Sequence, residues 1–432
     1  MKKFNTSPIS GMQELLPSLQ VEFNRLKSGI SEAFVKHGFQ NIETPTIERT
    51  EILLAKAGGD TEKQIYKVVK TAETADDADQ ALRFDHTVPL SRYVVEHMND
   101  LTFPFKVTQI GRNFRGERAQ KGRFREFYQC DVDIIGWQKL PIGYDAEAIA
   151  TLSEALKVLP IDKFTARISN RKLLNGLLEE FNLQNQSAEV FDIIDHAEKV
   201  PEETTVSALK ELGLGDMDIT KITTFSKLSG HREEVIGQLR DLNIANTKFN
   251  EGLDELETVL TLLEDKIDDR IDITADMMIV RGLDYYTGTV FEFIAPEYRE
   301  IGSICGGGRY ENLSQNYTDQ ALPGVGGSIG LTRLFYILRE KKLVADSTNK
   351  PVDICVVPIS ENEFIVANRL ADKLRSEGYK ADVNLTDKKL GDKMKYAEKV
   401  ATSVVVVGET EARDGKYRLK NFETGDSKEL NI

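Results

Sequence analysis

The spacing of apolar side chains predicts an N-terminal helix that is followed by extended chain. Between residues 18 and 37 the apolar positions recur at intervals of three or four, the period of a helix with one buried face: Leu19, Phe23, Leu26, Ile30 and Phe34. Gly38 predicts the end of this helix. The segment "FQNIETPTIE" then predicts an extended stretch closed around Pro45, because the residue before a proline avoids helical geometry.

Short apolar runs that alternate with charged loops predict antiparallel strands over residues 81–136. A basic loop at 115–125 joins two of these strands. Beyond them the apolar pattern predicts helices over 144–158 and 170–182. A helical pattern with little punctuation then continues over about 185–270, and it contains no motif that assigns a function.

Three segments after the helical stretch predict a return to strands. The β-branched and aromatic side chains of "DMMIVRGLDYYTGTVFEFIA" favour extended chain. We expect "GGGRYENL" to turn into a helix, and "GVGGSIGLTRLFYILRE" to form a glycine-rich strand that leads into another helix.

The pattern changes after a polar connector near residue 350. The segments "VDICVVPI", "KADVNL" and "SVVVVGE" alternate with helices over 361–377 and 390–401, and a strand or hairpin follows. This βαβαβ order predicts a small α/β domain with a largely parallel sheet. The expected organisation is a core with a helical insertion, a linker and a C-terminal domain: 1–340 with the insertion at about 185–270, 341–351, and 352–432.

The composition is that of an ordinary globular protein. With 432 residues, 40% hydrophobic and 29% charged, the chain is long enough for about two or three domains. No apolar run approaches the roughly 20 residues of a membrane-spanning helix, and no secretory signal is visible, so we expect a cytoplasmic protein without a membrane partner. The cysteines, Cys130, Cys305 and Cys355, show no metal-ligand spacing, so no protein-held metal site is expected.

The charge is distributed unevenly along the chain. The net charge is −14, which argues against nonspecific wrapping of nucleic acid. Residues 350–432 hold 15 Lys and Arg against 15 Asp and Glu, so the excess of acidic residues lies entirely upstream. A neutral tail on an acidic body suggests a separate module.

The strongest local signal is a basic loop within this acidic chain. Residues 111–126 hold six Lys and Arg against two Glu. Arginines in a loop between strands can grip phosphates through paired hydrogen bonds, and Phe124 and Phe127 offer flat surfaces on which a base can stack. A solvated, charged hairpin is the alternative interpretation of such a loop. The interleaved aromatic residues favour a nucleotide site.

The stretch "GRNFRGERAQKGRFREFYQCDVDIIG" resembles motif 2 of the class II aminoacyl-tRNA synthetases, in the form found in the histidyl-tRNA synthetase family. "NIETPTIERTEIL" resembles motif 1, "VRGLDYYTGTVFE" the histidine-specific signature of that family, and "GVGGSIGLTRL" motif 3. "LRFDHTVPLSRY" and "GGGRYENL" are similar to further family segments. The resemblance covers residues 8–340 and continues into the tail.

The resemblance implies an α+β catalytic domain, built on an antiparallel sheet flanked by helices, with a helical insertion. It also implies that the C-terminal α/β domain binds the anticodon. Five lysines of the tail could then supply phosphate contacts, although interrupting acidic residues are equally typical of an exposed helix: Lys388, Lys389, Lys393, Lys395 and Lys399.

The resemblance also implies a histidine site. Its expected residues are Asp85, Thr87, Gln129, Asp133, Tyr285, Tyr286 and Tyr310. Asp85, Thr87 and Gln129 would hold the α-amino group, since an ammonium requires acceptors. Asp133 and Tyr286 would contact the two imidazole nitrogens, although Asp133 stands where many relatives carry Glu. His86 is expected to be a structural side chain.

An ATP site follows from the same resemblance. Arg115 and Arg281 are the expected catalytic residues, and both would face the α-phosphate. ATP would be held by Arg115, Glu117, Arg123, Phe127 and Arg333, with the ring of Phe127 stacked on adenine. Mg²⁺ is expected with ATP, bridging the β- and γ-phosphates without a dedicated protein cage.

The implied reaction has two steps and three substrates: ATP, L-histidine and tRNA(His). The histidine carboxylate attacks the α-phosphate of ATP, and the 3′ end of the tRNA then takes the histidyl group. A homodimer is expected from the family. The alternatives are a regulatory relative of the synthetases, a module that senses uncharged tRNA, and a class II synthetase for another amino acid. The retained tail disfavours the first alternative, and "RGLDYYTG" disfavours the last.

Overall fold

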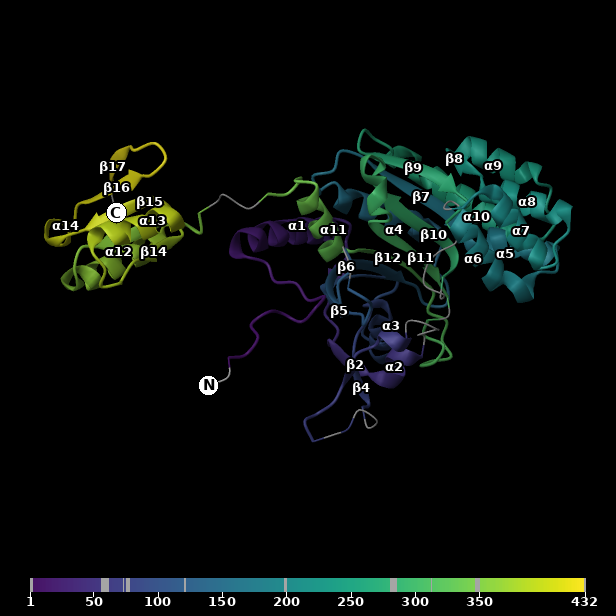
Figure 1. The fold of residues 1–432 in the computed structure, drawn as a ribbon, viewed down its shortest axis with the longest axis horizontal. Coiled ribbons are helices and arrows are strands. Elements are labelled where there is room, and N and C mark those ends of the chain that lie inside the picture. Colours follow the sequence, from purple (N-terminus) through teal and green to yellow (C-terminus); the bar gives the residue numbers. More distant parts are fainter. Residues whose placement is uncertain are drawn as a thin grey trace. The chain divides into compact units, whose positions relative to one another are not determined.

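The computed structural model describes residues 3–55, 62–72, 74, 78–119, 122–197, 200–279, 286–311, 313–345 and 350–430. These residues form two compact units, Met1–Ala345 and Asp346–Ile432, which we call the larger unit and the C-terminal unit. Each unit has its own buried apolar clusters. Figure 1 shows their helices and strands.

The larger unit is built on a sheet of nine strands. Across the sheet they are β1 (Gln40–Asn41), β5 (Phe105–Phe114), β6 (Glu126–Ile135), β12 (Gly324–Ile329), β11 (Cys305–Tyr310), β10 (Tyr286–Ile294), β7 (Phe164–Asn170), β9 (Ile271–Asp276) and β8 (Ser229–Gly230). The pairs β1–β5 and β7–β9 are parallel, and every other neighbouring pair is antiparallel. The predicted antiparallel sheet is therefore confirmed.

The helices predicted upstream of residue 270 are also confirmed. Helix α1 ends one residue before His37, and the backbone of Gly38 then turns into the left-handed region with φ +81°. The helices over the remaining ranges are α4 (Gly143–Leu156), α5 (Arg171–Glu180), α6 (Ser187–His196), α7 (Glu202–Glu211), α8 (Asp216–Ser226), α9 (Arg232–Asp241) and α10 (Thr247–Leu263), after α1 (Pro17–Lys36). Figure 1 shows that α5 to α10 gather beside β8 and β9.

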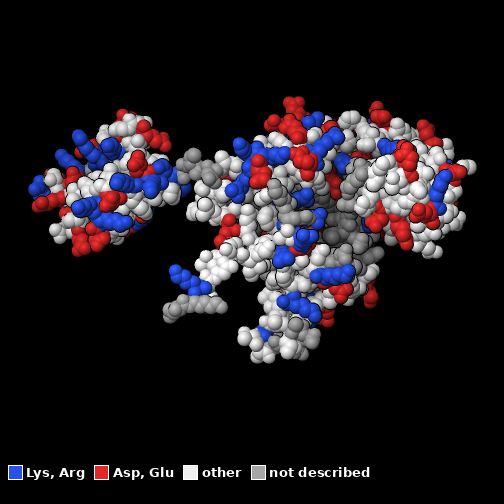
Figure 2. Space-filling view, in the orientation of Figure 1, with Lys and Arg blue, Asp and Glu red and all other residues white. Residues whose placement is uncertain are grey.

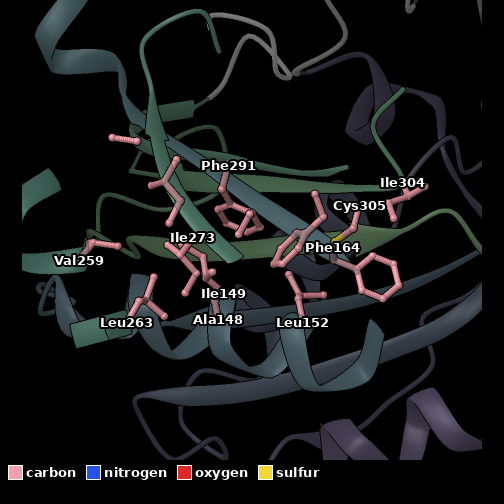
Figure 3. Packing of buried hydrophobic residues seen from close by; sticks show 14 of the residues in the cluster. Ala148, Ile149, Leu152, Phe164, Val259, Leu263, Ile273, Phe291, Ile304 and Cys305 are labelled. Carbon is pink, nitrogen blue, oxygen red and sulfur yellow. The ribbon is translucent and has the colours of Figure 1, made fainter. Parts of the chain in front are cut away.

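Helix α4 and the sheet enclose the main apolar core. Figure 3 shows Ala148, Ile149 and Leu152 of this helix lying among Phe164, Phe291 and other side chains of the sheet. Ala148, Ile149, Leu152 and Phe164 are fully buried. Burial of a side chain the size of Leu or Phe stabilises the fold by about 1.5–3 kcal/mol, so this layer stabilises the packing of α4 against the sheet.

Strands β11 and β12 pair through glycines. Their register sets Gly307 opposite Gly327 and Gly308 opposite Gly326. A Cβ atom on Gly307 would collide with the carbonyl oxygen of Gly326 and lie 2.6 Å from the Cα of Gly327. The glycines therefore allow two backbones to approach where side chains would keep them apart.

The prediction that "GGGRYENL" turns into a helix is wrong. The segment continues strand β11 to Tyr310, and a turn follows it in the described residues. Glycine costs about 1 kcal/mol in a helix relative to alanine, whereas here Gly307 and Gly308 allow close approaches to the neighbouring strands.

The remaining elements of the larger unit border the sheet. A three-stranded antiparallel sheet has the order β2 (Ile47–Arg49), β4 (Gln80–Leu82), β3 (Lys67–Val68). The helices not yet named are α2 (Thr50–Leu54), α3 (Thr87–Glu96) and α11 (Leu331–Glu340), with short 3₁₀ turns η1 (Glu62–Gln64), η3 (Gln184–Gln186), η5 (Glu264–Lys266) and η6 (Pro296–Ile301). Helix α3 begins beside the sheet and α11 follows directly after β12, so both helix starts lie near its central strands.

The C-terminal unit has the predicted βαβαβ order followed by a hairpin. Its strands, in sheet order, are β14 (Ala381–Val383), β13 (Val352–Pro358), β15 (Ala401–Val407), β16 (Tyr417–Asn421) and β17 (Ser427–Leu430). β13 pairs in parallel with β14 and β15, and the pairs β15–β16 and β16–β17 are antiparallel. The helices are α12 (Phe364–Ser376), α13 (Leu390–Val400) and α14 (Glu409–Asp414), with the 3₁₀ turn η7 (Glu361–Glu363).

One of the tail lysines expected to contact phosphate lies in the interior. Lys393 of α13 is 1% exposed, and its ammonium donates to the carbonyl oxygen of Pro358 at 2.9 Å. The prediction for this residue is wrong, because helical spacing places it toward the sheet. Lys388, Lys389, Lys395 and Lys399 are exposed. Figure 2 shows basic and acidic side chains interleaved on the visible face of this unit.

No helix within the described parts of the chain is long and apolar enough to cross a bilayer.

We predict that Gly307→Ala will destabilise the larger unit by about 1–3 kcal/mol, because overpacking forces the neighbouring backbone to shift. The measurement is denaturant unfolding followed by the fluorescence of Trp137, the only tryptophan of the chain. Gly237→Ala in α9 is the control, since no atom lies within 4 Å of the added Cβ. This control should be stabilising by about 0.5–1 kcal/mol. An unchanged unfolding midpoint for Gly307→Ala would show that the strands need no glycine there.

Candidate active site

The sequence-predicted site residues that the structure describes gather in two adjoining pockets on the central sheet. The first, which we call the inner pocket, is lined by Asp85, Thr87, Gln129, Asp133, Tyr286 and Tyr310. The second, the outer pocket, is lined by Glu117, Arg123, Phe127 and Arg333. Arg115 lines both pockets. The residues expected to bind histidine and those expected to bind ATP therefore lie on either side of the guanidinium of Arg115.

Strand β6 supplies a row of polar side chains to the inner pocket. Gln129, Asp131 and Asp133 stand two residues apart, so their side chains project from the same face of the strand. On the neighbouring strand β12, Gly326 lies opposite Asp133 and Ser328 lies opposite Asp131. A Cβ atom on Gly326 would collide with the carboxylate of Asp133. The glycine thus leaves the space that this carboxylate occupies.

Asp133 and Tyr310 form a buried hydrogen-bonded pair. The hydroxyl of Tyr310 donates to Oδ1 of Asp133 at 2.8 Å, and both residues are nearly inaccessible to solvent. Burial raises the pKa of Asp133 well above its usual range, and repulsion from Asp131 adds to the effect while the Tyr310 hydroxyl opposes it. Burial likewise raises the pKa of Tyr310. The tyrosine therefore remains a hydrogen-bond donor that orients the carboxyl group.

Asp85 presents one unsatisfied oxygen at the start of helix α3. Its Oδ1 accepts from the backbone N–H of Val88 at 3.1 Å, whereas its Oδ2 is buried without a partner among the described residues. Burial raises the pKa of Asp85 to about 6, and the nearby charge of Arg115 opposes that rise. A buried carboxylate oxygen without a partner carries a large desolvation penalty. A ligand that brings a cationic donor would remove that penalty.

Gln129 is held between two other side chains. Its Oε1 accepts from Nδ2 of Asn113 at 2.7 Å, and its Nε2 donates to Oγ of Ser328 at 2.7 Å. Asp131 and Ser328 line the same pocket, yet neither was predicted from the sequence as a site residue. The period-two alternation of β6 could have indicated Asp131. Ser328, the single polar side chain within "GVGGSIG", carried a similar signal.

The outer pocket is dominated by three guanidinium groups, those of Arg115, Arg123 and Arg333. Arg333 donates to the carbonyl oxygen of Ile301 at 2.7 Å. Burial lowers the pKa of Arg333, and the positive charge of Arg123 acts in the same direction. The sequence left open whether the basic loop is merely solvated. Two of its arginines, Arg115 and Arg123, instead line a cavity, an arrangement suited to an anionic ligand.

Aromatic and acidic side chains complete the outer pocket. The guanidinium of Arg115 lies 5.1 Å from the ring centroid of Phe127, and its Nε donates to the carbonyl oxygen of Phe84 at 3.1 Å. Glu117 accepts from Arg123 at 3.4 Å. Phe127 therefore offers a flat apolar surface within a basic cavity, a combination that suits a nucleotide.

Two expected residues, Arg281 and Tyr285, lie outside the described residues. Among the residues that the structure does describe, no group of three His, Cys, Asp or Glu side chains is placed to hold a metal ion. Cys130, Cys305 and Cys355 are buried free thiols.

Comparison with known proteins gives consistent similarities along the whole chain. The family model described as histidyl-tRNA synthetase matches residues 11–334, and one described as anticodon binding domain matches residues 353–432. The histidine–tRNA ligase of Clostridium tetani is 45% identical over 438 aligned residues, which cover 100% of this chain and 98% of that protein. The corresponding protein of Clostridium acetobutylicum is 42% identical over 100% of this chain and 99% of its own length.

Solved structures show the same similarity. The histidyl-tRNA synthetase of Nostoc sp. PCC 7120 superposes with a TM-score of 0.85 at 36% identity, covering 99% of this chain and 97% of that one. A Bacillus halodurans structure, described as an ATP phosphoribosyltransferase regulatory subunit/histidyl-tRNA synthetase, has a TM-score of 0.78 at 23% identity, covering 95% of this chain and 100% of that one. At that identity the likeness concerns the fold alone.

We predict that Asp85→Asn will stabilise the ligand-free protein at neutral pH. Burial raises the pKa of Asp85 from 3.8 to about 6, so between these values the native state holds a proton that the unfolded state has lost. The unfolding free energy of the wild type therefore falls as pH rises through this window. Asparagine does not titrate, so the unfolding free energy of Asp85→Asn should exceed that of the wild type by up to about 3 kcal/mol at pH ~7.5. This difference should disappear below pH ~4.

Denaturant unfolding of both proteins at several pH values measures this difference. Asp254→Asn, at an exposed position of α10, is the matched control, and its effect should not vary across the window. An Asp85→Asn effect of equal size at every pH would contradict the raised pKa.

Proposed function

The chain belongs to the histidyl-tRNA synthetase family, and from that premise we propose that it activates L-histidine with ATP and transfers it to the 3′ end of tRNA(His). The histidine carboxylate attacks the α-phosphate, the bond to the β-phosphate oxygen breaks, and histidyl-adenylate and pyrophosphate form. The 3′-terminal hydroxyl of the tRNA then attacks the activated carbonyl, and AMP leaves. The observation that carries this proposal is the meeting of the inner and outer pockets at Arg115.

The inner pocket holds the α-amino group of histidine at Asp85. The unpartnered Oδ2 of Asp85 accepts a hydrogen bond from the ammonium, which supplies this buried oxygen with a cationic donor. Thr87 and Gln129 line the same wall and complete the contacts to the ammonium. An ion pair in such a dry site is stronger than one on the surface, because solvent does not screen it.

The imidazole ring of histidine lies between Asp133 and Tyr286. The Tyr310 hydroxyl occupies Oδ1 of Asp133 and leaves Oδ2 to accept from the imidazole N–H. Tyr286, the register partner of Tyr310, contacts the second nitrogen. A side chain without these two polar groups would leave buried partners unsatisfied, which gives strong discrimination between amino acids.

Arg115 serves the reaction itself. It lines both pockets, so its guanidinium lies between the attacking carboxylate and the α-phosphate. It draws two anions together and neutralises the charge that develops on the phosphate in the transition state. The resemblance assigns a second cation of this kind to Arg281. Little proton transfer is needed, so positioning and charge neutralisation supply most of the rate enhancement.

ATP is held in the outer pocket. The adenine ring stacks on Phe127, with Arg333 on its other side, and Glu117 and Arg123 complete the site. Base stacking on an aromatic ring contributes about 1–3 kcal/mol. The guanidinium groups of Arg123 and Arg333 also suit the terminal phosphates.

Mg²⁺ accompanies ATP in this proposal. Magnesium in nucleotide sites is commonly held by the phosphates with one or two carboxylates. Glu117 lines the outer pocket, and Glu292 lines the cavity that adjoins it through Arg115 and Arg333. These side chains fit that pattern, and the ion would neutralise phosphate charge.

We also infer that the protein acts as a homodimer in the cytoplasm and that its C-terminal unit contacts the anticodon of tRNA(His). The family supports the dimer, and the segment "NIETPTIERTEIL" resembles the dimer-forming motif 1. A monomer in sedimentation equilibrium would contradict the first inference. Unimpaired charging of tRNA after removal of residues 346–432 would contradict the last.

We predict that the purified protein will exchange pyrophosphate into ATP only when histidine is supplied with Mg²⁺. Histidine alone satisfies the polar groups of the inner pocket. The measurement is incorporation of labelled pyrophosphate with each of the other amino acids as a control. Exchange with a different amino acid would refute the proposed function and favour a class II synthetase for that amino acid. No exchange with any amino acid would also refute it and would favour a regulatory or tRNA-sensing relative.

We predict that Tyr310→Phe will raise the KM for histidine about tenfold and leave the KM for ATP unchanged, because Asp133 loses the donor that orients its carboxylate. The assay is the same pyrophosphate exchange. Tyr317→Phe removes a hydroxyl that donates to the carbonyl oxygen of Ile52 at 3.3 Å, and it serves as the matched control. Equal KM values for histidine in wild type and Tyr310→Phe would contradict the role given to this pair.

A further inference from the structure

Five side chains, three of which line the inner pocket, form a continuous chain of hydrogen bonds, which we call the His86 chain. Its members in order are His86, Asp131, Ser328, Gln129 and Asn113. The three bonds other than the one between Ser328 and Asp131 measure 2.9, 2.7 and 2.7 Å. His86, Asp131 and Asn113 are nearly inaccessible to solvent. Water therefore does not compete for the bond between His86 and Asp131.

The carboxylate of Asp131 determines which groups of the His86 chain donate and which accept. Asp131, as a carboxylate, offers only acceptors, so Nδ1 of His86 donates to its Oδ2. The hydroxyl of Ser328 likewise donates to Oδ1. The Ser328 oxygen is then the acceptor for Nε2 of Gln129. The amide of Gln129 thus has a single orientation in the pocket.

His86 also belongs to the turn that carries Asp85 and Thr87. Its backbone carbonyl accepts from the backbone N–H of Leu90 at 3.0 Å and from Nε2 of Gln109 at 3.3 Å. One residue therefore ties the start of helix α3 to strand β5 through its backbone, and to strand β6 through its side chain. Asp85 and Gln129, which face the same pocket from different elements, are linked through it.

The space around the other ring nitrogen is restricted. Nε2 of His86 is buried without a partner among the described residues. A Cβ atom on Gly111 would lie 3.2 Å from this nitrogen and 2.6 Å from Nη2 of Arg83. Gly111 is the register partner of Gln129 on strand β5. The ring is therefore confined on the side facing β5 and bonded on the side facing β6.

We propose that His86 is a positioning residue for histidine, which sets the spacing and orientation of Asp85 and Gln129 around the α-ammonium group by way of Asp131 and Ser328. The inference rests on the proposed function, since it concerns the same inner pocket. His86 acts through these neighbours and not by contact with the substrate. Its role therefore concerns the histidine site, and the outer pocket is reached only through Gln129, which lines both pockets.

The test compares substitutions that preserve or remove the Nδ1 bond. His86→Leu keeps an apolar side chain of similar size and removes the bond, so the KM for histidine in pyrophosphate exchange should rise about tenfold with the KM for ATP unchanged. His86→Asn places an amide nitrogen at the position of Nδ1 and should restore most of the affinity. His86→Gln places its amide nitrogen nearer the position of Nε2 and should not restore the affinity for histidine.

Two further variants separate positioning from general destabilisation. Thr108→Val removes a buried hydrogen bond of 2.8 Å to the backbone carbonyl of Asp131 but leaves the His86 chain intact, so its KM for histidine should match the wild type. Ser328→Ala interrupts the chain at its centre, so it should also raise the KM for histidine about tenfold with the KM for ATP unchanged. This variant tests the proposal independently if His86→Leu does not fold.

Unchanged KM for histidine in both His86→Leu and Ser328→Ala would overturn the proposal. Parallel increases in the KM values for histidine and ATP, or equal effects of His86→Asn and His86→Gln, would also overturn it. If the wild type itself exchanges no pyrophosphate with histidine, the proposed function fails, and this result is distinct from the failure of the positioning role.

Discussion

The close approach of β11 and β12 is the constraint on which the rest of the larger unit depends. Gly307 and Gly327 face each other, and side chains at these positions would force the two backbones apart. β12 pairs with β6 along its other edge, and the polar row on β6 comes to lie beside Tyr310 of β11. Gly326 and Gly327 of β12 therefore line the inner pocket with backbone, while most of the polar side chains that line it come from the neighbouring elements.

The sequence predicted the class of fold because its signals were local. Helix α1 and the βαβαβ order of the C-terminal unit follow from apolar period and strand composition. The helix expected in "GGGRYENL" failed because the need for glycine there comes from a neighbouring strand, which no local rule contains. The phosphate contact predicted for Lys393 was wrong for a similar reason, since charge in a sequence does not indicate which face of a helix is buried. The described candidate-site residues were named through resemblance. Strand alternation could have indicated Asp131, and a lone serine among glycines could have indicated Ser328, but their contact depends on the register of β6 and β12.

The inner pocket concentrates negative charge at a cost to the folded state. Asp85, Asp131 and Asp133 all lie in it and are almost fully buried. Burial raises the pKa values of Asp85 and Asp133, which means that each is less stable ionised here than in water. Such groups persist where a bound ligand compensates them. In the absence of that ligand each carboxylate has its own donors: His86 and Ser328 bond Asp131, Tyr310 bonds Asp133, and the backbone N–H of Val88 bonds Asp85.

A single guanidinium shared by two pockets makes the binding of one substrate sensitive to the other. In the proposed site, Arg115 is the charge that a carboxylate in the inner pocket and a phosphate in the outer pocket would have in common. When one anion is already bound, the second finds that charge partly neutralised, so each ligand lowers the affinity for the other by the same factor. The thermodynamic penalty is largest when both anions are present together. Joining the carboxylate to the phosphate and releasing pyrophosphate relieves it, so the shared arginine converts competition between ligands into a driving force for their reaction.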